Sequence, residues 1–306
     1  MGTRLRPRAV AVVGPTATGK SELAVKLAQR LDGEVLNADA MQLYQGMNIG
    51  TAKLLPAQRG GVRHHLLDIL NVTESASVAT YQREARRIME ELLSANRVPV
   101  LTGGSGLYVR AVLDELHFPG TDPELRARLE AELAEYGAPA LHHRLYRLDP
   151  VAASRILPTN GRRLVRALEV IQLTGRPFSA ALPQSGPARY GAVLIGLDAD
   201  PAELDVRVDA RVDRMFAEGL IEEVRQLLPL GLREGRTAAR ALGYHQVLAA
   251  LDAGVDPRCA VEPTARATRR FIRRQRSWFR RDGRIRWLNS DRPGLLEAAL
   301  TATVGG

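Results

Sequence analysis

The chain has 306 residues, 45% of them hydrophobic and 25% charged, which is typical of a folded globular protein and excludes a disordered or fibrous chain. Its single cysteine, Cys259, excludes a disulfide framework and a cysteine-rich zinc site. The single cysteine fits a reducing compartment, so we expect a cytoplasmic protein. No apolar run approaches the ~20 residues of a membrane helix, so we expect no membrane partner. The formal net charge is +9.

Strand and helix patterns alternate along most of the chain. Short apolar runs predict strands over 10–13, 34–39, 98–101, 192–197 and 285–288. Apolar residues at helical spacing predict helices over 21–31 and 80–93, and mainly helical structure after residue 200. This alternation favours an α/β fold with a parallel sheet, whose ligands bind at the carboxyl ends of the strands.

A helical segment interrupts this pattern. Helices are predicted over 123–135, 138–147 and 161–174, and turn-rich sequence lies at 119–123 and 183–187. We therefore expect a helical insertion domain over 119–187 within a catalytic core formed by 1–118 and 188–306.

The first predicted strand runs into a complete phosphate-binding loop followed by a helix. The loop comprises Gly14, Pro15, Thr16, Ala17, Thr18, Gly19, Lys20 and Ser21. Its backbone N–H groups and the helix dipole favour an anion, Lys20 adds a positive charge, and the Ser21 hydroxyl is a candidate Mg²⁺ ligand. We predict a bound di- or triphosphate with Mg²⁺ as cofactor, and a P-loop NTPase-like sheet domain.

Most phosphate-loop proteins transfer a phosphoryl group and place a second acid at the end of a neighbouring strand to hold Mg²⁺. Asp39 and Asp198 each follow or end a predicted strand. A nucleotide or small-molecule kinase is therefore one alternative.

An ordered series of motifs follows the loop and resembles the tRNA isopentenyltransferase family from about residue 8 to 290. The motifs lie at 37–44, 46–53, 64–69, 103–108, 162–169, 207–212, 241–244 and 273–280. The resemblance implies transfer of a dimethylallyl group from dimethylallyl pyrophosphate to the exocyclic amine of the adenosine 3′ of the tRNA anticodon. Pyrophosphate, the leaving group, would occupy the phosphate loop.

The amine loses a proton as it attacks, which calls for a general base. Asp39, after the second predicted strand, matches the family's acid and is our candidate; Lys20 would stabilise the leaving group. Ser105 stands where the family usually has threonine and retains the hydroxyl, so we include it among the catalytic residues.

Arg207 and Arg211 match family arginines near the pyrophosphate and share one helix face. The alternative is a salt-bridge role with Asp205 or Asp209. We interpret His64 and His65 as structural or pocket-lining residues and not as metal ligands, because no acid or Cys/His pair at ligand spacing accompanies them.

The resemblance also implies contacts with the tRNA anticodon stem-loop, whose target base must be flipped out. The candidate RNA-contacting residues are Asp39, Ala40, Met41, Gln42, Ser105, Arg126, Arg162, Arg163, Leu164, Val165, Arg166, Arg240, Gly243, Tyr244 and His245. Tyr244 offers a stacking ring, with a packed ring in a helix junction as the alternative.

Ten arginines and one acid lie between residues 266 and 286, a net charge equal to the surplus of the whole chain. Such density predicts a nucleic-acid partner. We expect a docked helix with Arg269, Arg273, Arg276 and Arg280 toward phosphates; a solvated helix face is the alternative.

Three other functions compete with the tRNA reaction. These are isopentenyl transfer to free AMP, ADP or ATP, the kinase activity described above, and RNA binding without catalysis. The insertion and the basic segment favour a large RNA, and intact Lys20, Ser21 and Asp39 favour catalysis. We expect a monomer.

Overall fold

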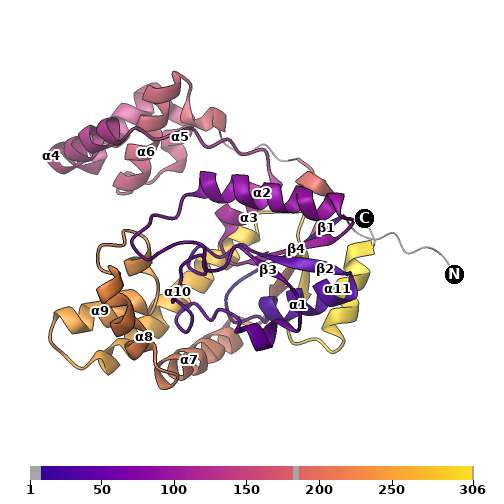
Figure 1. Ribbon diagram of the computed structural model, residues 1–306. Coiled ribbons are helices and arrows are strands. Elements are labelled where there is room, and N and C mark those ends of the chain that lie inside the picture. Colours follow the sequence, from indigo (N-terminus) through magenta and orange to yellow (C-terminus); the bar gives the residue numbers. More distant parts are fainter. Residues whose placement is uncertain (1–7, 182–185, 305–306) are drawn as a thin grey trace. The chain divides into compact units, whose positions relative to one another are not determined.

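The computed structural model describes residues 8–181 and 186–304 (Figure 1). All pairings of its six-stranded sheet are parallel, and the strand order is β3-β2-β4-β1-β5-β6. The strands are β1 Ala9–Val13, β2 Gly33–Asn37, β3 His64–His65, β4 Val98–Gly103, β5 Ala192–Asp198 and β6 Arg286–Asn289. The helices are α1 Lys20–Arg30, α2 Val78–Ser94, α3 Gly106–Leu113, α4 Pro123–Leu148, α5 Pro150–Arg155, α6 Gly161–Thr174, α7 Pro201–Ala217, α8 Leu220–Leu227, α9 Tyr244–Asp252, α10 Val261–Phe279 and α11 Leu295–Val304.

Helices cover both faces of the sheet, and the alternation of side chains along β1 explains why. Ala9, Ala11 and Val13 of β1 pack against α2 and α3, while Val10 and Val12 pack against α1 and α11 (Figure 1). A strand buried on both faces must be apolar throughout, and every residue of β1 is buried. The predicted α/β fold with a parallel sheet is confirmed.

The chain divides into two compact units, one formed by 1–113 and 187–306 and the other by 114–186. The second unit holds α4, α5 and α6 around its own apolar core of Leu129, Leu145, Leu164 and Leu168. Its predicted helices are present, except that 123–135 and 138–147 form one helix, α4, interrupted at Gly137. It begins five residues before the predicted boundary at 119; residues 183–185 of the predicted far edge lie outside the described residues.

A buried carboxylate explains why residues near 120 belong to the second unit. Glu169 of α6 is fully buried and accepts hydrogen bonds from Arg126 Nη2 at 2.5 Å and Arg166 Nη1 at 2.7 Å. Arg166 also donates to the carbonyl oxygens of Pro119 and Gly120 at 2.7 and 3.0 Å. This network ties the entering segment to α4 and α6.

Burial alone would raise the pKa of Glu169, but the hydrogen bonds and charges of Arg126 and Arg166 outweigh burial and lower the pKa below its ordinary value. The carboxylate therefore stays ionised at neutral pH. Its partners cannot be replaced by water, because the group is sealed within the unit.

Several elements were not predicted from sequence. They are the two-residue strand β3 and the helices α3 and α5. The predicted strands and the helices at 21–31, 80–93 and 161–174 are confirmed to within two residues at each end. Among the described residues, the helices are too short or too polar to cross a bilayer.

We predict that Glu169→Gln destabilises the second unit by about 2–3 kcal/mol, because hydrogen bonds to a charged group are lost. A lowered folded-state pKa contributes stability above the unfolded value of about 4.3, and that contribution is lost as pH falls through the folded-state pKa. The variant should therefore lose less stability than the parent between pH 5 and 3. Hydrogen exchange of α4 and α6 measures both effects.

Glu132→Gln is the matched control. Glu132 pairs with Arg144 at 2.6 Å, but both side chains are partly exposed, and such pairs contribute about 0–1 kcal/mol. Equal losses for the two variants would contradict a special role for Glu169.

Candidate active site

The carboxyl ends of the strands bring the predicted catalytic residues to one edge of the sheet. The phosphate loop follows β1, Asp39 lies two residues beyond β2, and Ser105 lies two residues beyond β4. The strand order places a switch point between β1 and β4: the connection from β1 crosses to β2 on one side, whereas the connection from β4 crosses to β5 on the other. Ligands of open α/β sheets bind at such a point.

The phosphate loop is held by hydrogen bonds to its own backbone and to α10. Thr18 Oγ1 donates to the carbonyl oxygen of Pro15 at 2.9 Å, and Lys20 Nζ donates to the same oxygen. Gly14 has φ +131°, and a Cβ there would lie 2.2 Å from the carbonyl oxygen of Leu197. The loop therefore requires glycine where it passes β5.

Gln275 of α10 is a site residue that sequence reasoning missed. Its Oε1 accepts the N–H of Thr16 at 3.0 Å, and its Nε2 donates to the carbonyl oxygen of Gly104 at 2.9 Å. Gln275 is buried, so it joins the phosphate loop to the loop that carries Ser105. The available signal was a glutamine directly flanked by arginines, inside the motif at 273–280.

Lys20 and Arg211 form a cationic pair beside Asp39. Burial, and secondarily the charge of Arg211, lower the pKa of Lys20 from 10.5 to about 7, while Asp39 opposes the shift. Burial also lowers the pKa of Arg211, again opposed by Asp39. Arg211 has no ion pair within the described part of the chain. Two cations against one carboxylate favour binding of a polyanion.

Arg207, the other predicted pyrophosphate ligand, is engaged elsewhere. Its Nη2 pairs with Asp291 at 2.5 Å and its Nη1 donates to Ser290 Oγ at 3.2 Å. The segment after β6 therefore supplies the salt-bridge partner that was expected to be Asp205 or Asp209, and pyrophosphate binding by Arg207 stays a prediction. Asp291 is a partner that sequence spacing did not suggest.

Asp39 is oriented by its neighbours. Its N–H donates to Asn37 Oδ1 at 2.9 Å, and its Oδ1 accepts the N–H of Met41 at 2.9 Å. Asn37 Nδ2 in turn donates to the carbonyl oxygen of Leu66 at 2.9 Å. The second carboxylate oxygen has no hydrogen bond among the described residues. Ser105 Oγ accepts the N–H of Ala40 at 3.4 Å, which places its hydroxyl beside the Asp39 segment.

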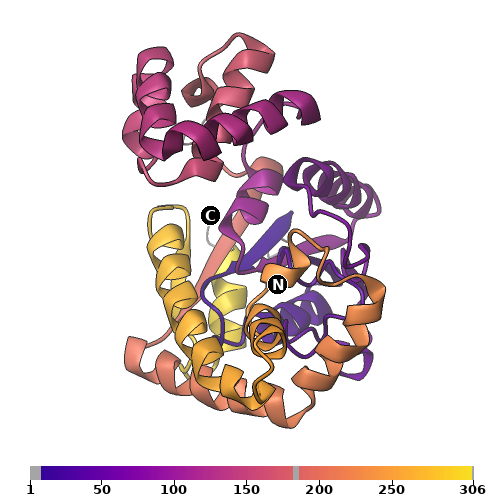
Figure 2. The same ribbon diagram turned by 90° about the vertical axis from the view of Figure 1, so that its left-hand side faces the viewer.

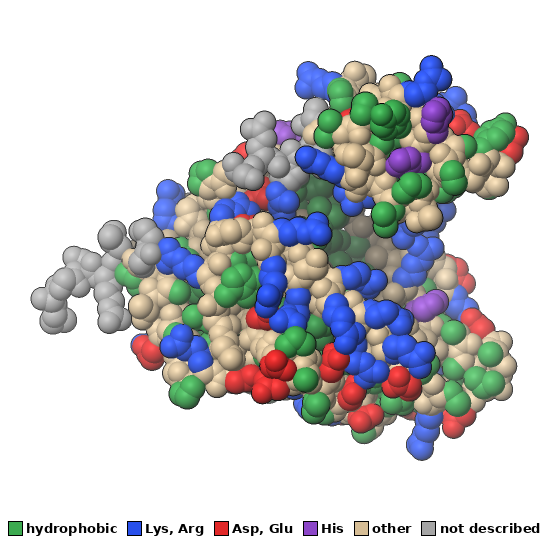
Figure 3. Space-filling view, turned by 180° about the vertical axis from the view of Figure 1, so that it is seen from behind, with side chains coloured by type: hydrophobic (Ala, Val, Ile, Leu, Met, Phe, Trp, Pro, Cys, Tyr) green, Lys and Arg blue, Asp and Glu red, His purple; other side chains and the backbone are tan. Residues whose placement is uncertain are grey.

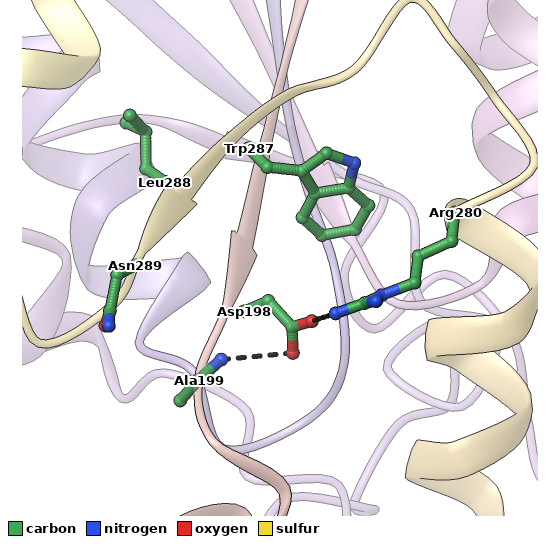
Figure 4. A pocket seen from close by; sticks show the side chains of 6 residues that line it. All are labelled: Asp198, Ala199, Arg280, Trp287, Leu288 and Asn289. Carbon is green, nitrogen blue, oxygen red and sulfur yellow. Dashed lines mark hydrogen bonds and ion pairs between the residues drawn. The ribbon is translucent and has the colours of Figure 1, made fainter.

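Asp198, the alternative metal-binding acid, is already neutralised. Its two oxygens lie 2.9 Å from Arg276 Nε and 2.9 Å from Arg280 Nη2, and Oδ1 also accepts the N–H of Ala199 at 3.0 Å. It lies at a cavity that Trp287, Leu288 and Asn289 also line (Figure 4). Its lone pairs are therefore poorly available to Mg²⁺, which weakens the kinase alternative.

The predicted RNA-contacting residues of the first unit divide by burial. Ala40, Met41 and Gln42 are half-buried, whereas Arg240 and His245 are exposed. Tyr244 is fully buried and donates its hydroxyl proton to Glu223 Oε1 at 2.5 Å, and Gly243 is also buried. Stacking of a base on Tyr244 was therefore wrong, because its ring fills a helix junction.

In the second unit, Arg162 and Arg163 are exposed, but Leu164 and Val165 are buried in the core. Their side chains lie on the inner face of α6, so Arg162 and Arg163 are the exposed side chains of the predicted RNA-contacting group 162–166, whose contact with RNA stays a prediction. Arg126 and Arg166 are committed to Glu169, a use that sequence reasoning also missed.

The arginines of α10 serve two purposes. The four that were expected to face phosphates are each paired with an acid: Arg269 with Asp209, Arg273 with Asp205, and Arg276 and Arg280 with Asp198; Arg266 also pairs with Glu262. α7 packs alongside α10 (Figure 2) and supplies two of the acids. The side chains of Arg273 and Arg280 are still 61% exposed, so that these arginines face phosphates stays a prediction.

Other arginines of this segment remain available. Arg270, Arg274 and Arg281 are exposed and have no ion pair within the residues that the structure describes. Basic side chains gather on the face that carries α10 (Figure 3). The positive surface of this segment therefore includes Arg270, Arg274 and Arg281 in addition to the exposed side chains of Arg273 and Arg280.

The two histidines have structural surroundings. His65 Nε2 lies 2.6 Å from Glu34 Oε2, and His64 Nδ1 lies 2.9 Å from the carbonyl oxygen of Val62. Burial lowers the pKa of His64, which favours its neutral form. Within the described residues, no group of three or more His, Cys, Asp or Glu side chains could hold a metal ion.

Comparison with known proteins places this geometry in a family. The family model described as IPP transferase matches residues 42–282. A tRNA dimethylallyltransferase of Saccharopolyspora erythraea is 68% identical over 94% of this chain and 93% of that relative.

Solved structures agree. The tRNA isopentenylpyrophosphate transferase of Bacillus halodurans is 39% identical, with a TM-score of 0.70 and 96% of each chain covered. The corresponding protein of Staphylococcus epidermidis is 30% identical, with a TM-score of 0.70, covering 96% of this chain and 97% of that one. Sequence and fold together establish that the chain belongs to the IPP transferase family.

Proposed function

We propose that the chain transfers a dimethylallyl group from dimethylallyl pyrophosphate to the exocyclic amine of the adenosine 3′ of the anticodon in tRNA. The observation that carries the proposal is the juxtaposition of Lys20 and Arg211 with Asp39. A cationic cradle for a leaving pyrophosphate lies beside a carboxylate that can accept a proton. Relatives 57–68% identical carry the name tRNA dimethylallyltransferase, which favours this reaction over the alternatives.

The reaction has two electrostatic demands. As the amine nitrogen attacks the allylic carbon, the carbon–oxygen bond breaks and pyrophosphate leaves with the electron pair. The loop N–H groups, Lys20 and Arg211 stabilise the charge on the leaving group. The Asp39 carboxylate receives the proton that the amine loses, and the Ser105 hydroxyl contacts the amine or a phosphate oxygen.

Mg²⁺ fits the residues at the loop. Ser21 lies in the first turn of α1 and is half-buried. Its hydroxyl has no hydrogen bond within the described chain. Mg²⁺ keeps several waters and binds through few protein ligands together with substrate phosphates, so one hydroxyl beside a pyrophosphate suffices. When bound, the ion would supply further charge neutralisation to the leaving group.

We assign the tRNA contacts to predicted residues that are exposed or half-buried. We propose that residues 39–42 and Ser105 meet the flipped adenosine, since a base within a stacked loop cannot reach Asp39. Arg162 and Arg163 of the second unit would contact the anticodon stem-loop, as would Arg240, His245 and the unpaired arginines of α10. Phosphate contacts of this kind give affinity and register without sequence choice. The enzyme would work as a monomer in the cytoplasm, where tRNA is modified.

A transfer assay tests the proposal. Purified protein is incubated with Mg²⁺, radiolabelled dimethylallyl pyrophosphate and unmodified tRNA, with AMP and ATP as parallel acceptors. Label in dimethylallyl-adenosine from tRNA is the expected result. Label only in AMP or ATP would reassign the acceptor, and ATP turnover without label would indicate a kinase.

Asp39→Asn should lower kcat for transfer by about 10²–10⁴, the usual contribution of a general base, and leave pyrophosphate affinity within about threefold. Single-turnover transfer and calorimetry measure these quantities. Asp213→Asn, which changes an exposed acid of α7, should leave both unchanged. A normal rate in Asp39→Asn would remove Asp39 from the proton-transfer step.

The lowered pKa of Lys20 predicts that pyrophosphate binding depends on pH. Free Lys20, with a pKa of about 7, is largely neutral above that pH, and a bound polyanion raises its pKa. Affinity should therefore be highest below pH 7 and fall by up to about tenfold per unit above it, with proton uptake on binding.

Calorimetry in buffers of different ionisation enthalpy measures that uptake. Lys20→Met serves as the reference that subtracts the titration of pyrophosphate itself. Equal proton uptake in the parent and the variant would contradict the assignment.

Removing two unpaired arginines should weaken tRNA binding most at low salt. For Arg270→Ala/Arg274→Ala we expect the slope of log K against log salt to decrease by about 1.5, or roughly 0.7–0.9 per phosphate contact. The charge-matched control is Arg225→Ala/Arg233→Ala, whose arginines are paired with Glu222 and Asp252. Identical slopes for the two double variants would show that only net charge matters.

A further inference from the structure

The Glu223 carboxylate of α8 is buried and receives hydrogen bonds from four donors. It accepts the N–H groups of Asn48 at 3.0 Å, Ile49 at 2.9 Å and Gly50 at 3.3 Å, together with the Tyr244 hydroxyl at 2.5 Å. Three successive backbone N–H groups therefore converge on one side chain from a distant part of the sequence. These contacts join the motifs at 46–53 and 241–244, to which the reaction itself assigns no role.

The same loop is fixed from its other end by Lys53. Its buried ammonium donates to the carbonyl oxygen of Tyr44 at 2.8 Å and to Asp68 Oδ1 at 2.5 Å. Gly50 allows the ring of Tyr244 to approach, since a Cβ there would lie 2.4 Å from Tyr244 Cε2. The loop 44–53 is thus held by two buried charged groups and one aromatic contact.

A side-chain hydrogen bond links this loop to Gln42 of the proposed RNA-contacting segment. Gln42 Nε2 donates to the carbonyl oxygen of Thr51 at 3.1 Å, and Thr51 Oγ1 donates to the carbonyl oxygen of Met47 at 2.6 Å. With its amide nitrogen engaged, Gln42 presents Oε1 as an acceptor. A purine amino group is a donor that such an oxygen recognises.

We propose that Glu223 is a positioning residue, which fixes the carboxamide of Gln42 through the backbone of 48–51 so that Oε1 accepts a hydrogen bond from a base of the RNA substrate. This inference rests on the proposed function. The side chain must offer acceptors to three N–H donors, and an amide in its place would turn N–H donors of its own toward the loop.

A double-mutant cycle tests this proposal. Gln42→Ala should raise KM for tRNA by about tenfold, the loss of one well-placed hydrogen bond, and Glu223→Gln should raise it several-fold. The double variant should be no worse than Gln42→Ala, because Glu223 acts through Gln42. KM for dimethylallyl pyrophosphate should stay within about twofold throughout, which a general loss of folding would not produce.

Controls separate positioning from stability. Glu222→Gln changes the adjacent exposed carboxylate, paired with Arg225, and should leave KM for tRNA unchanged. Tyr244→Phe removes one hydrogen-bond donor to Glu223 and keeps the ring, so it should raise KM for tRNA less than Glu223→Gln does. If Glu223→Gln does not fold, Tyr244→Phe takes its place in the cycle.

Binding of a labelled anticodon stem-loop runs in parallel with transfer. Multiplicative effects in the cycle, no effect of Gln42→Ala on tRNA, or equal rises in both KM values would each overturn the positioning role. If the parent protein binds the stem-loop but does not transfer the dimethylallyl group, the proposed function is contradicted. The same double-mutant cycle, measured as stem-loop affinity, would then still test the positioning role of Glu223.

Discussion

The parallel arrangement of the six strands is the constraint on which the site depends. Because the strands share one direction, the phosphate loop, Asp39 and Ser105 leave the sheet at the same edge, although they are far apart in sequence. Burial then intensifies the electrostatics at that edge: it lowers the pKa of Lys20 to about 7 and makes an incoming polyanion the natural partner of Lys20 and Arg211.

Helix α10 links the two chemistries that we propose. Its inner face carries Gln275, which ties the phosphate loop to the Ser105 loop. Its flank pairs with acids of α7 and β5, and its outer face leaves Arg270 and Arg274 exposed. A single helix thus positions the catalytic loops, fixes itself to the fold and offers charge to RNA.

Two buried carboxylates organise the segments that are expected to meet the tRNA. Glu169 holds Arg126, Arg166 and the entry to the second unit, whereas Glu223 holds backbone N–H groups of the loop 48–50. A buried carboxylate requires its hydrogen-bond partners to be in place, so each of the two gives the segment that it contacts a defined conformation.

The sequence by itself determined the features that rest on contiguous residues. The phosphate loop, the strand–helix alternation and the helical insertion are visible because their physics is local. Only the tertiary structure decided the partner and the burial of each side chain. Arg207 forms an ion pair with Asp291, whereas Arg211 forms none among the described residues, and the side chains of Leu164 and Tyr244 are buried. Gln275 and Glu223 also belong to this class. A side chain's partner depends on which distant segments the sheet brings together, and the spacing of residues along the chain does not determine which segments those are.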